Sequence, residues 1–264
     1  MRQGFSERDA LRLKGLSKDM NEHDQYMQDF MTIFSSLDRW GPGSEEDTLS
    51  ALHQVPHTPR RLLEIGCGNG VATRLLAQHT TAAITAVDNA ASALEKLTAI
   101  ARLNGTASRI ETVCASMTDL PFADATFDLV WAEGCAYIMG VEQALECWRS
   151  LLEPNGILVL SDLVWLTGTP SGEAIEFWRN DYPDMTSTER RVEQMDKAGY
   201  HLLNTFSLSR QAWDNYIVPL RARIDELHTH MPNSTALADL DRELNIYQDC
   251  LGEFGYQFFI LQKC

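Results

Sequence analysis

From residue 61 onward, short apolar segments alternate with segments of helical periodicity, and this alternation constrains the fold more than any other feature. The apolar runs include RLLEI, AAITAVD and FDLVWAE, and the helical segments between them include ATRLLAQH and EQALECWRSLL. Strands that alternate with helices form a mostly parallel sheet with helices on both faces. The sequence therefore predicts an α/β fold with a doubly wound, seven-stranded, mostly parallel sheet.

Helical patterns lie on both sides of this alternating region. Residues 7–38 carry apolar side chains at helical spacing, and the GPG at 41–43 interrupts the pattern in a tight loop. A helix is expected to restart after Ser44, which is suited to cap it, with Asp47 three residues later. We expect N-terminal helices before the core and further helices before the last strand.

These patterns give a domain organisation with approximate boundaries. The expected parts are an N-terminal helical cap at 1–58, a core at 59–264, a lid at about 163–187 and a helical insertion at about 208–254.

The segment LLEIGCGNG, residues 62–70, places three glycines in a turn between the first strand and the helix that follows. Glycine lets a ligand approach the backbone closely, because it has no Cβ. The dinucleotide fingerprint needs G-x-G-x-x-G, but here the third glycine is at 70 and position 71 is Val. The G-x-G-x-G spacing therefore fits NAD and FAD poorly.

Two carboxylates accompany the glycines. Glu64 ends the first strand, where its charge would repel a pyrophosphate and suit an ammonium or sulfonium group. Asp88 ends the next strand, eighteen residues beyond Gly70, where a carboxylate can accept hydrogen bonds from both hydroxyls of a ribose. The crevice thus favours a ligand with a ribose and a cationic tail.

The segments LEIGCGNG, AVDNA, SMTDLPF and FDLVWAEG resemble, in order and spacing, the motifs of class I S-adenosylmethionine-dependent methyltransferases. The resemblance covers about residues 60–165 and implies a Rossmann-like fold with S-adenosyl-L-methionine as the cofactor. The segments GPGS, WAEGCAYIMG, EFW, YP and AGY are similar to those of a bacterial subgroup of small-molecule methyltransferases.

The resemblance also implies roles for individual residues. Glu64, Gly66, Cys67 and Gly68 would line the methionine portion of the cofactor. Asp88 and Asn89 would meet the ribose and the adenine edge, and Trp40 and Glu133 would complete the cofactor site. Many relatives have an acid four residues before the LPF element, whereas this chain has Ser116, whose hydroxyl can still accept a hydrogen bond. The backbone N–H of Met117 would meet a ring nitrogen, or Met117 is a core residue.

The methyl acceptor is expected beyond the fourth strand, FDLVW, because ligands of open parallel sheets bind outside the carboxyl ends of the strands. Glu133 and Tyr137 follow this strand and are the candidates for catalysis, with His23 as a weaker one. Trp178 and Tyr182, in the expected lid with Phe177, are candidates for substrate contact or for packing.

The composition excludes several classes of function. The 22 basic and 37 acidic residues give a net charge of −15, which disfavours nucleic acid as a partner. No apolar run is long enough for a membrane span or a signal peptide, and the six cysteines form no metal-binding spacing. We therefore expect a cytoplasmic protein with no metal and no membrane partner, acting on a small-molecule acceptor, and homo-oligomerisation stays open.

Two other functions compete with methyl transfer. One is a noncatalytic S-adenosylmethionine-binding regulatory protein, because the cofactor motifs are stronger than any catalytic motif. The other is an NAD-linked oxidoreductase, which both Val71 and Glu64 disfavour.

Overall fold

The structure is a computed structural model that describes residues 22–264, so the part of the first predicted helix before residue 22 lies outside the described residues. A helix runs over 22–34, and α2 (Glu45–His53) follows the loop at 39–43. Ser44 is the N-cap of α2, and its Oγ accepts a hydrogen bond of 3.0 Å from the backbone N–H of Asp47. The predicted start of this helix is confirmed.

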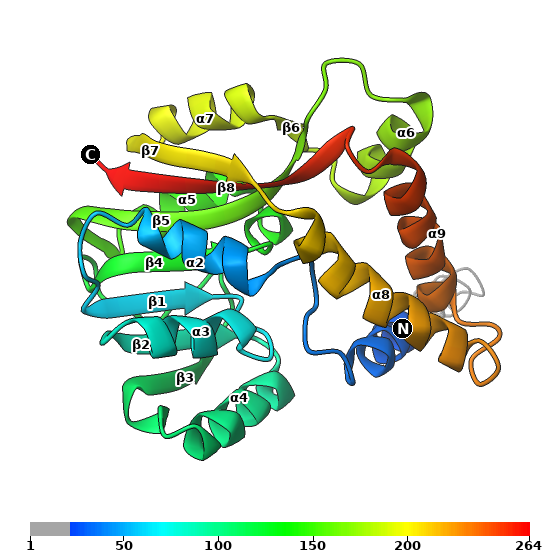
Figure 1. The fold of residues 1–264 in the computed structure, drawn as a ribbon, viewed down its shortest axis with the longest axis horizontal. Coiled ribbons are helices and arrows are strands. Elements are labelled where there is room, and N and C mark those ends of the chain that lie inside the picture. Colours follow the sequence, from blue (N-terminus) through cyan, green and yellow to red (C-terminus); the bar gives the residue numbers. More distant parts are fainter. Residues whose placement is uncertain (1–21) are drawn as a thin grey trace, which may run out of the picture. The chain divides into compact units, whose positions relative to one another are not determined.

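The core of the protein is a mixed, mostly parallel sheet (Figure 1). Its strands are β1 (Arg61–Ile65), β2 (Ala83–Asp88), β3 (Ile110–Cys114), β4 (Phe127–Glu133), β5 (Leu152–Trp165), β6 (Thr186–Ser187), β7 (Tyr200–Ser207) and β8 (Phe254–Lys263). The order is β3-β2-β1-β4-β5-β8-β7, in which β8 is antiparallel to both neighbours. This path of seven strands confirms the predicted fold class, and the two-residue β6, which the sequence did not predict, pairs with the end of β5.

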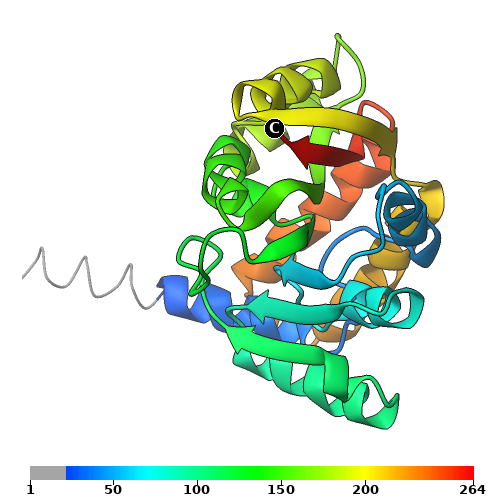
Figure 2. The same ribbon diagram turned by 90° about the vertical axis from the view of Figure 1, so that its left-hand side faces the viewer.

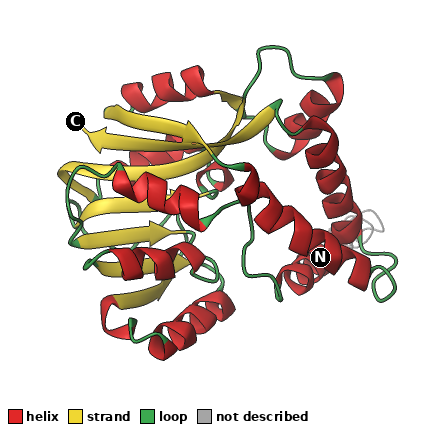
Figure 3. Cartoon of the chain, in the orientation of Figure 1, coloured by secondary structure: helices red, strands yellow, loops and turns green. Residues whose placement is uncertain are grey.

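Helices cover both faces of the sheet. The helices after α2 are α3 (Val71–His79), α4 (Ala91–Leu103), α5 (Val141–Arg149), α6 (Gly172–Asp181), α7 (Thr188–Lys197), α8 (Arg210–Leu227) and α9 (Thr235–Cys250), with short 3₁₀ turns at Ala107–Arg109 and Ala136–Ile138. In Figure 2, which looks roughly along the strands, α2 and α3 lie on one face of the sheet, and α5 and α7 lie on the other. Figure 3 separates the strands from these helices by colour.

The chain divides into two compact units. One comprises residues 38–217 and 246–264 and contains the whole sheet. Of the other, the structure describes residues 22–37 and 218–245, where Arg223 Nη2 donates to the backbone oxygen of Thr32 (3.3 Å) and Arg221 forms an ion pair with Asp241. Helices α8 and α9 each contribute to both units. The predicted boundaries of the cap, lid and insertion stay predictions.

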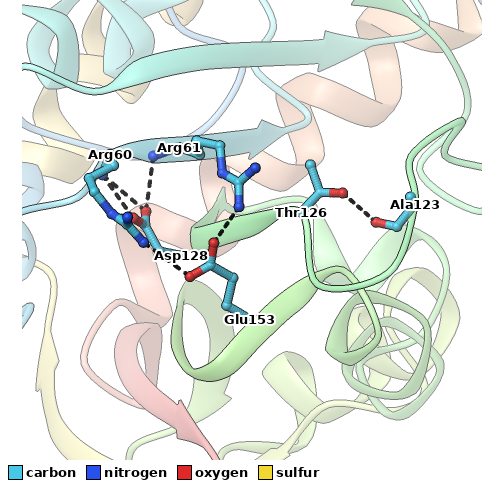
Figure 4. A network of polar contacts seen from close by, with 6 residues as sticks. All are labelled: Arg60, Arg61, Ala123, Thr126, Asp128 and Glu153. Carbon is cyan, nitrogen blue, oxygen red and sulfur yellow. Dashed lines mark hydrogen bonds and ion pairs between the residues drawn. The ribbon is translucent and has the colours of Figure 1, made fainter.

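A polar network at the amino ends of β1 and β4 fixes these two strands together (Figure 4). Asp128 is buried at the start of β4, and its Oδ1 accepts hydrogen bonds of 3.1 Å from the backbone N–H groups of both Arg60 and Arg61. Glu153 then pairs with the side chains of both arginines. Because the register of parallel strands carries through their length, this network also fixes how the carboxyl ends of β1 and β4 meet, which is where the candidate site lies.

Candidate active site

The turn between β1 and α3 is built from glycines in the left-handed region, with φ of 70° at Gly66, 50° at Gly68 and 72° at Gly70. A Cβ at Gly66 would lie 2.8 Å from the Sγ of Cys135, and one at Gly70 would collide with Leu97. These two glycines are therefore needed for packing. A Cβ at Gly68 would meet no atom within 4 Å, so this part of the backbone faces open space.

Asp88 lies at the carboxyl end of β2 and holds the glycine turn in place. Its Oδ2 accepts a hydrogen bond of 2.8 Å from the backbone N–H of Gly68, and its Oδ1 accepts one of 2.9 Å from that of Ala90. Each oxygen has a second lone pair for a ligand. The structure thus brings together Asp88 and Gly68, two of the residues that the sequence analysis assigned to the cofactor site.

Glu64 is buried at the end of β1 (4% exposed), and its Oε2 has no hydrogen-bond partner among the described residues. Burial, followed by the charges of Glu133 and Asp88, raises the pKa of its carboxyl group from about 4.5 to about 8, against the lowering effect of the nearby Thr73. Leaving a buried carboxyl oxygen without a partner is costly. A cationic group bound next to Glu64 would remove that cost.

Glu133 lies at the end of β4 and connects the sheet to α2 through a hydrogen bond. Its Oε1 accepts hydrogen bonds from Thr48 Oγ1 of α2 (2.8 Å) and from Trp131 Nε1 (2.9 Å). Burial raises the pKa of the Glu133 carboxyl group, and the nearby charge of Arg39 counteracts this. Glu64 is the neighbour of Trp131 in the register of β1 and β4, so Glu64, Trp131 and Glu133 share one face of the sheet.

The remaining predicted cofactor residues lie around this edge. Cys67 is buried in the glycine turn, and burial raises the pKa of its thiol. Asn89 and Ser116 are exposed after β2 and β3, and Ser116 Oγ hydrogen bonds with Thr118 Oγ1 (2.7 Å). The side chain of Met117 packs against the core, while its backbone oxygen accepts a hydrogen bond from Trp148 Nε1 (3.2 Å).

Three aromatic residues were predicted near the methyl acceptor. Tyr137 and Tyr182 contact each other, whereas Trp178 packs against other residues. Tyr137, 38% exposed in the turn after β4, packs its ring against that of Tyr182, with centroids 5.4 Å apart. Tyr182 is buried, and its hydroxyl donates to Asp162 (2.9 Å) and accepts from Arg191 (2.8 Å). Trp178 is buried against Phe254, with centroids 5.2 Å apart. Tyr182 and Trp178 therefore offer a ligand little surface.

Two predicted residues lie before α2. Trp40 is half-buried in the loop at 39–43. His23 is exposed on the helix at 22–34, which belongs to the other compact unit.

Comparison with known proteins identifies the region that contains these residues. A family model described as a methyltransferase domain matches residues 62–156, from β1 to the start of β5. O-methyltransferase resE of Aspergillus sclerotiorum is 26% identical over 69% of this chain and 75% of its own length. Malonyl-[acyl-carrier protein] O-methyltransferase of Methylovorus sp. is 33% identical over 45% of this chain and 42% of its own length. These matches support a class I S-adenosylmethionine-dependent methyltransferase, with the family model covering residues 62–156 of this chain.

Solved structures agree with this assignment at the level of the fold. An S-adenosylmethionine-dependent methyltransferase from Geobacter sulfurreducens, in complex with S-adenosyl-L-homocysteine, superimposes with a TM-score of 0.76 at 18% identity, over 89% of this chain and 97% of that one. The [4+2]-cyclase SpnF has the same fold, with a TM-score of 0.74 at 19% identity, over 92% and 95% of the two chains. The predicted cofactor, S-adenosyl-L-methionine, and the predicted activity, methyl transfer to a small molecule, are confirmed.

The residues of this methyltransferase fit that cofactor. The unpartnered Oε2 of buried Glu64 suits the ammonium group of the methionine portion, and the two oxygens of Asp88 suit the ribose hydroxyls. Gly68 leaves room beside the backbone. Glu64, together with Val71, is also what made NAD a poor candidate from the sequence, so the oxidoreductase alternative is not supported.

Three side chains at the methyltransferase site were not predicted from the sequence. Thr73 lies close enough to Glu64 to lower the pKa of its carboxyl group, Thr48 donates a hydrogen bond to Glu133, and the charge of Arg39 acts on Glu133. Arg39 directly precedes Trp40, which the sequence did single out. The two threonines carried no signal, because a threonine on a helix is more often a surface residue.

Two other kinds of feature are absent from residues 22–264. No helix there is long and apolar enough to cross a bilayer, and no group of three or more metal-ligating side chains comes together. All six cysteines, which lie within the described residues, are free thiols.

Proposed function

We propose that the protein transfers the methyl group of S-adenosylmethionine to an oxygen atom of a small-molecule acceptor, with Glu133 accepting the proton that the acceptor loses. The observation that carries the proposal is the partly buried Glu133 carboxyl group at the end of β4, whose pKa is raised by the burial of its charged form. Such a carboxylate is a stronger base than one in water. Relatives named O-methyltransferases support an oxygen acceptor.

Methyl transfer requires few other groups from the protein. S-adenosylmethionine supplies a methyl group that is already bonded to a good leaving group, so the protein must align the acceptor, exclude water and take up one proton. Glu64 holds the amino-acid portion of the cofactor, Asp88 holds its ribose, and Gly68 lets it approach the backbone. Tyr137, which is exposed and packs on Tyr182, forms the wall of the acceptor site beside Glu133.

We expect Glu133→Gln to lower turnover by about 100-fold, because a positioned general base contributes at least that much. Glutamine keeps an oxygen that can accept from Thr48 and Trp131, so the fold and the affinity for S-adenosylhomocysteine should stay within about threefold. The assay is S-adenosylhomocysteine release with panels of phenols, aliphatic alcohols, carboxylic acids and amines. Thr48→Val is the matched control, since it removes a hydrogen bond to Glu133 but not the charge.

Unchanged turnover in Glu133→Gln would show that Glu133 holds α2 and takes no proton. Methylation of amines alone would contradict an oxygen acceptor and leave methyl transfer intact. If no acceptor turns over while S-adenosylhomocysteine binds, catalysis itself is refuted.

We expect Asp88→Asn to weaken binding of S-adenosylhomocysteine by about 1.5–3 kcal/mol, the usual worth of hydrogen bonds to a charged group. Asparagine can still accept from the backbone N–H of Gly68 or Ala90, so the turn should keep its shape. Calorimetric titration measures the effect, and Asp124→Asn, in an exposed loop, is the control. An unchanged dissociation constant would remove Asp88 from the cofactor site.

Two further proposals concern the surroundings of the enzyme. We infer a cytoplasmic location from the free cysteines, which suit a reducing compartment. The net charge of −15 argues against nucleic acid as the acceptor. The oligomeric state stays open.

A further inference from the structure

Asp47 lies in the first turn of α2 and connects the N-termini of two helices. Its carboxylate is buried, and Oδ2 accepts hydrogen bonds from Ser44 Oγ (2.5 Å) and from Ser209 Oγ (2.7 Å). Ser44 caps α2, and Ser209 directly precedes α8, where its Oγ accepts from the backbone N–H of Ala212 (3.3 Å). A carboxylate is favoured at a helix N-terminus, and here a single carboxylate serves two. Asp47 therefore fixes the first turn of α2 against the first turn of α8.

The loop before α2 is held to α8 as well. The backbone N–H of Gly43 donates to Ala212 O (3.0 Å), and Gly43 O accepts from Asn215 Nδ2 (3.1 Å). The backbone N–H of Ser209 also donates to the Asp47 carboxylate (3.2 Å). All of these residues belong to the compact unit that contains the sheet. The position of α2 thus depends on α8 through hydrogen bonds on both sides of the helix cap.

Thr48, the residue after Asp47, connects this arrangement to Glu133. Its side chain is buried, and its Oγ1 donates to Glu133 Oε1 (2.8 Å). Trp131 Nε1 donates to the same oxygen (2.9 Å). Because both donors bind Oε1, Oε2 is the oxygen that is left to take up a proton. Oε2 lies toward Gly43, where a Cβ would be 3.6 Å away.

The charged and titratable groups that act on Glu133 come from several segments. Arg39 and Asp47 act from the residues before the sheet, Glu64 from β1, and the Cys135 thiol lies in the turn after β4. Burial raises the pKa of the Glu133 carboxyl group, Arg39 opposes the rise, and the negative charge of Asp47 adds to it. Asp47 therefore acts on Glu133 through its charge as well as through α2.

We propose that Asp47 is a positioning residue for proton uptake by Glu133, because it joins α2 to α8, fixes the Thr48 hydroxyl on Oε1 and so keeps Oε2 available for the proton. The inference rests on the proposed function, in which Glu133 is the base. Asp47 takes up no proton from the acceptor itself. It acts through Thr48 and through its charge.

The test measures turnover against pH for the original protein and for Asp47→Asn, by S-adenosylhomocysteine release with the fastest oxygen acceptor of the panels. Asparagine has the same size and can still accept from the N–H of Ser209, but it loses the charge and one acceptor oxygen. We expect turnover to fall by about tenfold, because a misplaced base keeps only part of its contribution. The rise of turnover with pH should move to lower pH, since the charge that opposes ionisation of Glu133 is gone. Affinity for S-adenosylhomocysteine should stay within about threefold, since Glu64 and Asp88 are unchanged.

Three further variants separate the two routes. Ser209→Ala removes a hydrogen bond to Asp47 and keeps the charge, so turnover should fall by about threefold without a shift along the pH axis. Glu189→Gln removes an exposed acid from the first turn of α7 and should change neither. Combined with Glu133→Gln, Asp47→Asn should lower turnover by less than about twofold further, because both changes then act on one group. If Asp47→Asn does not fold, Ser209→Ala with and without Glu133→Gln decides in the same way.

Unchanged turnover in Asp47→Asn, a pH profile that stays in place, or a loss of the same size with and without Glu133→Gln would overturn the role of Asp47. Full turnover in Ser209→Ala would overturn the connection to α8. Each of these results leaves the proposed function standing as long as Glu133→Gln alone lowers turnover. Normal turnover in Glu133→Gln alone would refute the proposed function instead, and the role of Asp47 with it.

Discussion

Glu64→Gln should make the ligand-free protein more stable by about 3 kcal/mol at pH 7, while weakening its affinity for S-adenosylhomocysteine by more than about tenfold. Burial raises the pKa of the Glu64 carboxyl group in the folded protein to about 8, against about 4.5 when it is exposed. Below pH 4.5 the group is protonated in both states and affects stability little. Between pH 4.5 and 8 the unfolded chain loses the proton and the folded chain keeps it, so the free energy of unfolding falls as pH rises.

Urea unfolding of the original protein and of Glu64→Gln at pH 5, 6, 7 and 8 measures this difference. The two should be similar at pH 5 and diverge toward pH 8, because glutamine does not titrate. Glu111→Gln, on the exposed side of β3, is the matched control and should not alter the pH dependence. Equal stability of the two proteins at every pH would mean that Glu64 ionises like an exposed glutamate and that its burial does not lower the free energy of unfolding.

Calorimetry in buffers of different ionisation enthalpy tests the same group from the ligand side. The ammonium of the cofactor favours the ionised form of Glu64, so binding at pH 7 should release a proton into the buffer. The release should disappear in Glu64→Gln. The carboxylate that binds the cofactor would then be the one that destabilises the free protein, as is common at functional sites.

Much of this fold could be predicted because local sequence and tertiary structure agree. The strands RLLEI and FDLVWAE are short and apolar, so each can be recognised from its own residues. The glycines that follow strands and the residues that cap helices, such as Ser44 before α2, are local signals as well. The glycine turn and Asp88 were found because their spacing along the chain reflects one strand, one turn and one helix. The seven-strand path follows from such units.

The surroundings of Glu133 could not be predicted in the same way. Thr48 is 85 residues from Glu133, and Arg39 acts on it from a loop whose course depends on α8 holding Gly43. No pattern in the sequence records such contacts between distant segments. The aromatic residues of the expected lid illustrate the same limit, because Trp178 and Tyr182 are buried by partners on β8 and α7 that periodicity alone does not identify.

Arg191, on α7, is fully buried, and its partners tie the segment after α6 to the sheet. Its Nε lies 2.9 Å from Asp162 Oδ2, and both side chains are 0% exposed. The Tyr182 hydroxyl accepts from Arg191 Nη2 (2.8 Å) and donates to Asp162, while its ring packs on Tyr137. Burial raises the pKa of the Asp162 carboxyl group to about 6, with the charge of Arg191 opposing the rise. The network therefore connects a buried ion pair to the proposed acceptor wall.

We expect Arg191→Met to destabilise the protein by about 3–5 kcal/mol, because it leaves the Asp162 carboxylate buried without its cation. The pKa of Asp162 should then rise further, so the loss should be smaller at pH 5, where the carboxyl group can stay protonated, than at pH 8. Urea unfolding at both pH values measures it. The neighbouring Arg190→Met is the matched control, since Arg190 pairs with Glu193 at the surface and should cost less than about 1 kcal/mol.

The double variant Arg191→Met with Asp162→Asn separates the buried charge from the packing of Arg191. Removing the charge together with its partner should recover much of the lost stability, because the cost arises from an ionised group without compensation. Turnover of the double variant should remain below that of the original protein. The Tyr182 hydroxyl has lost its donor and its charged acceptor, so the Tyr182 ring that packs on Tyr137 is no longer held in one orientation. Full recovery of turnover together with stability would mean that the network serves the fold alone. A single variant as stable as the original protein would show that Asp162 is already neutral beside Arg191, contrary to the ion pair that the geometry describes.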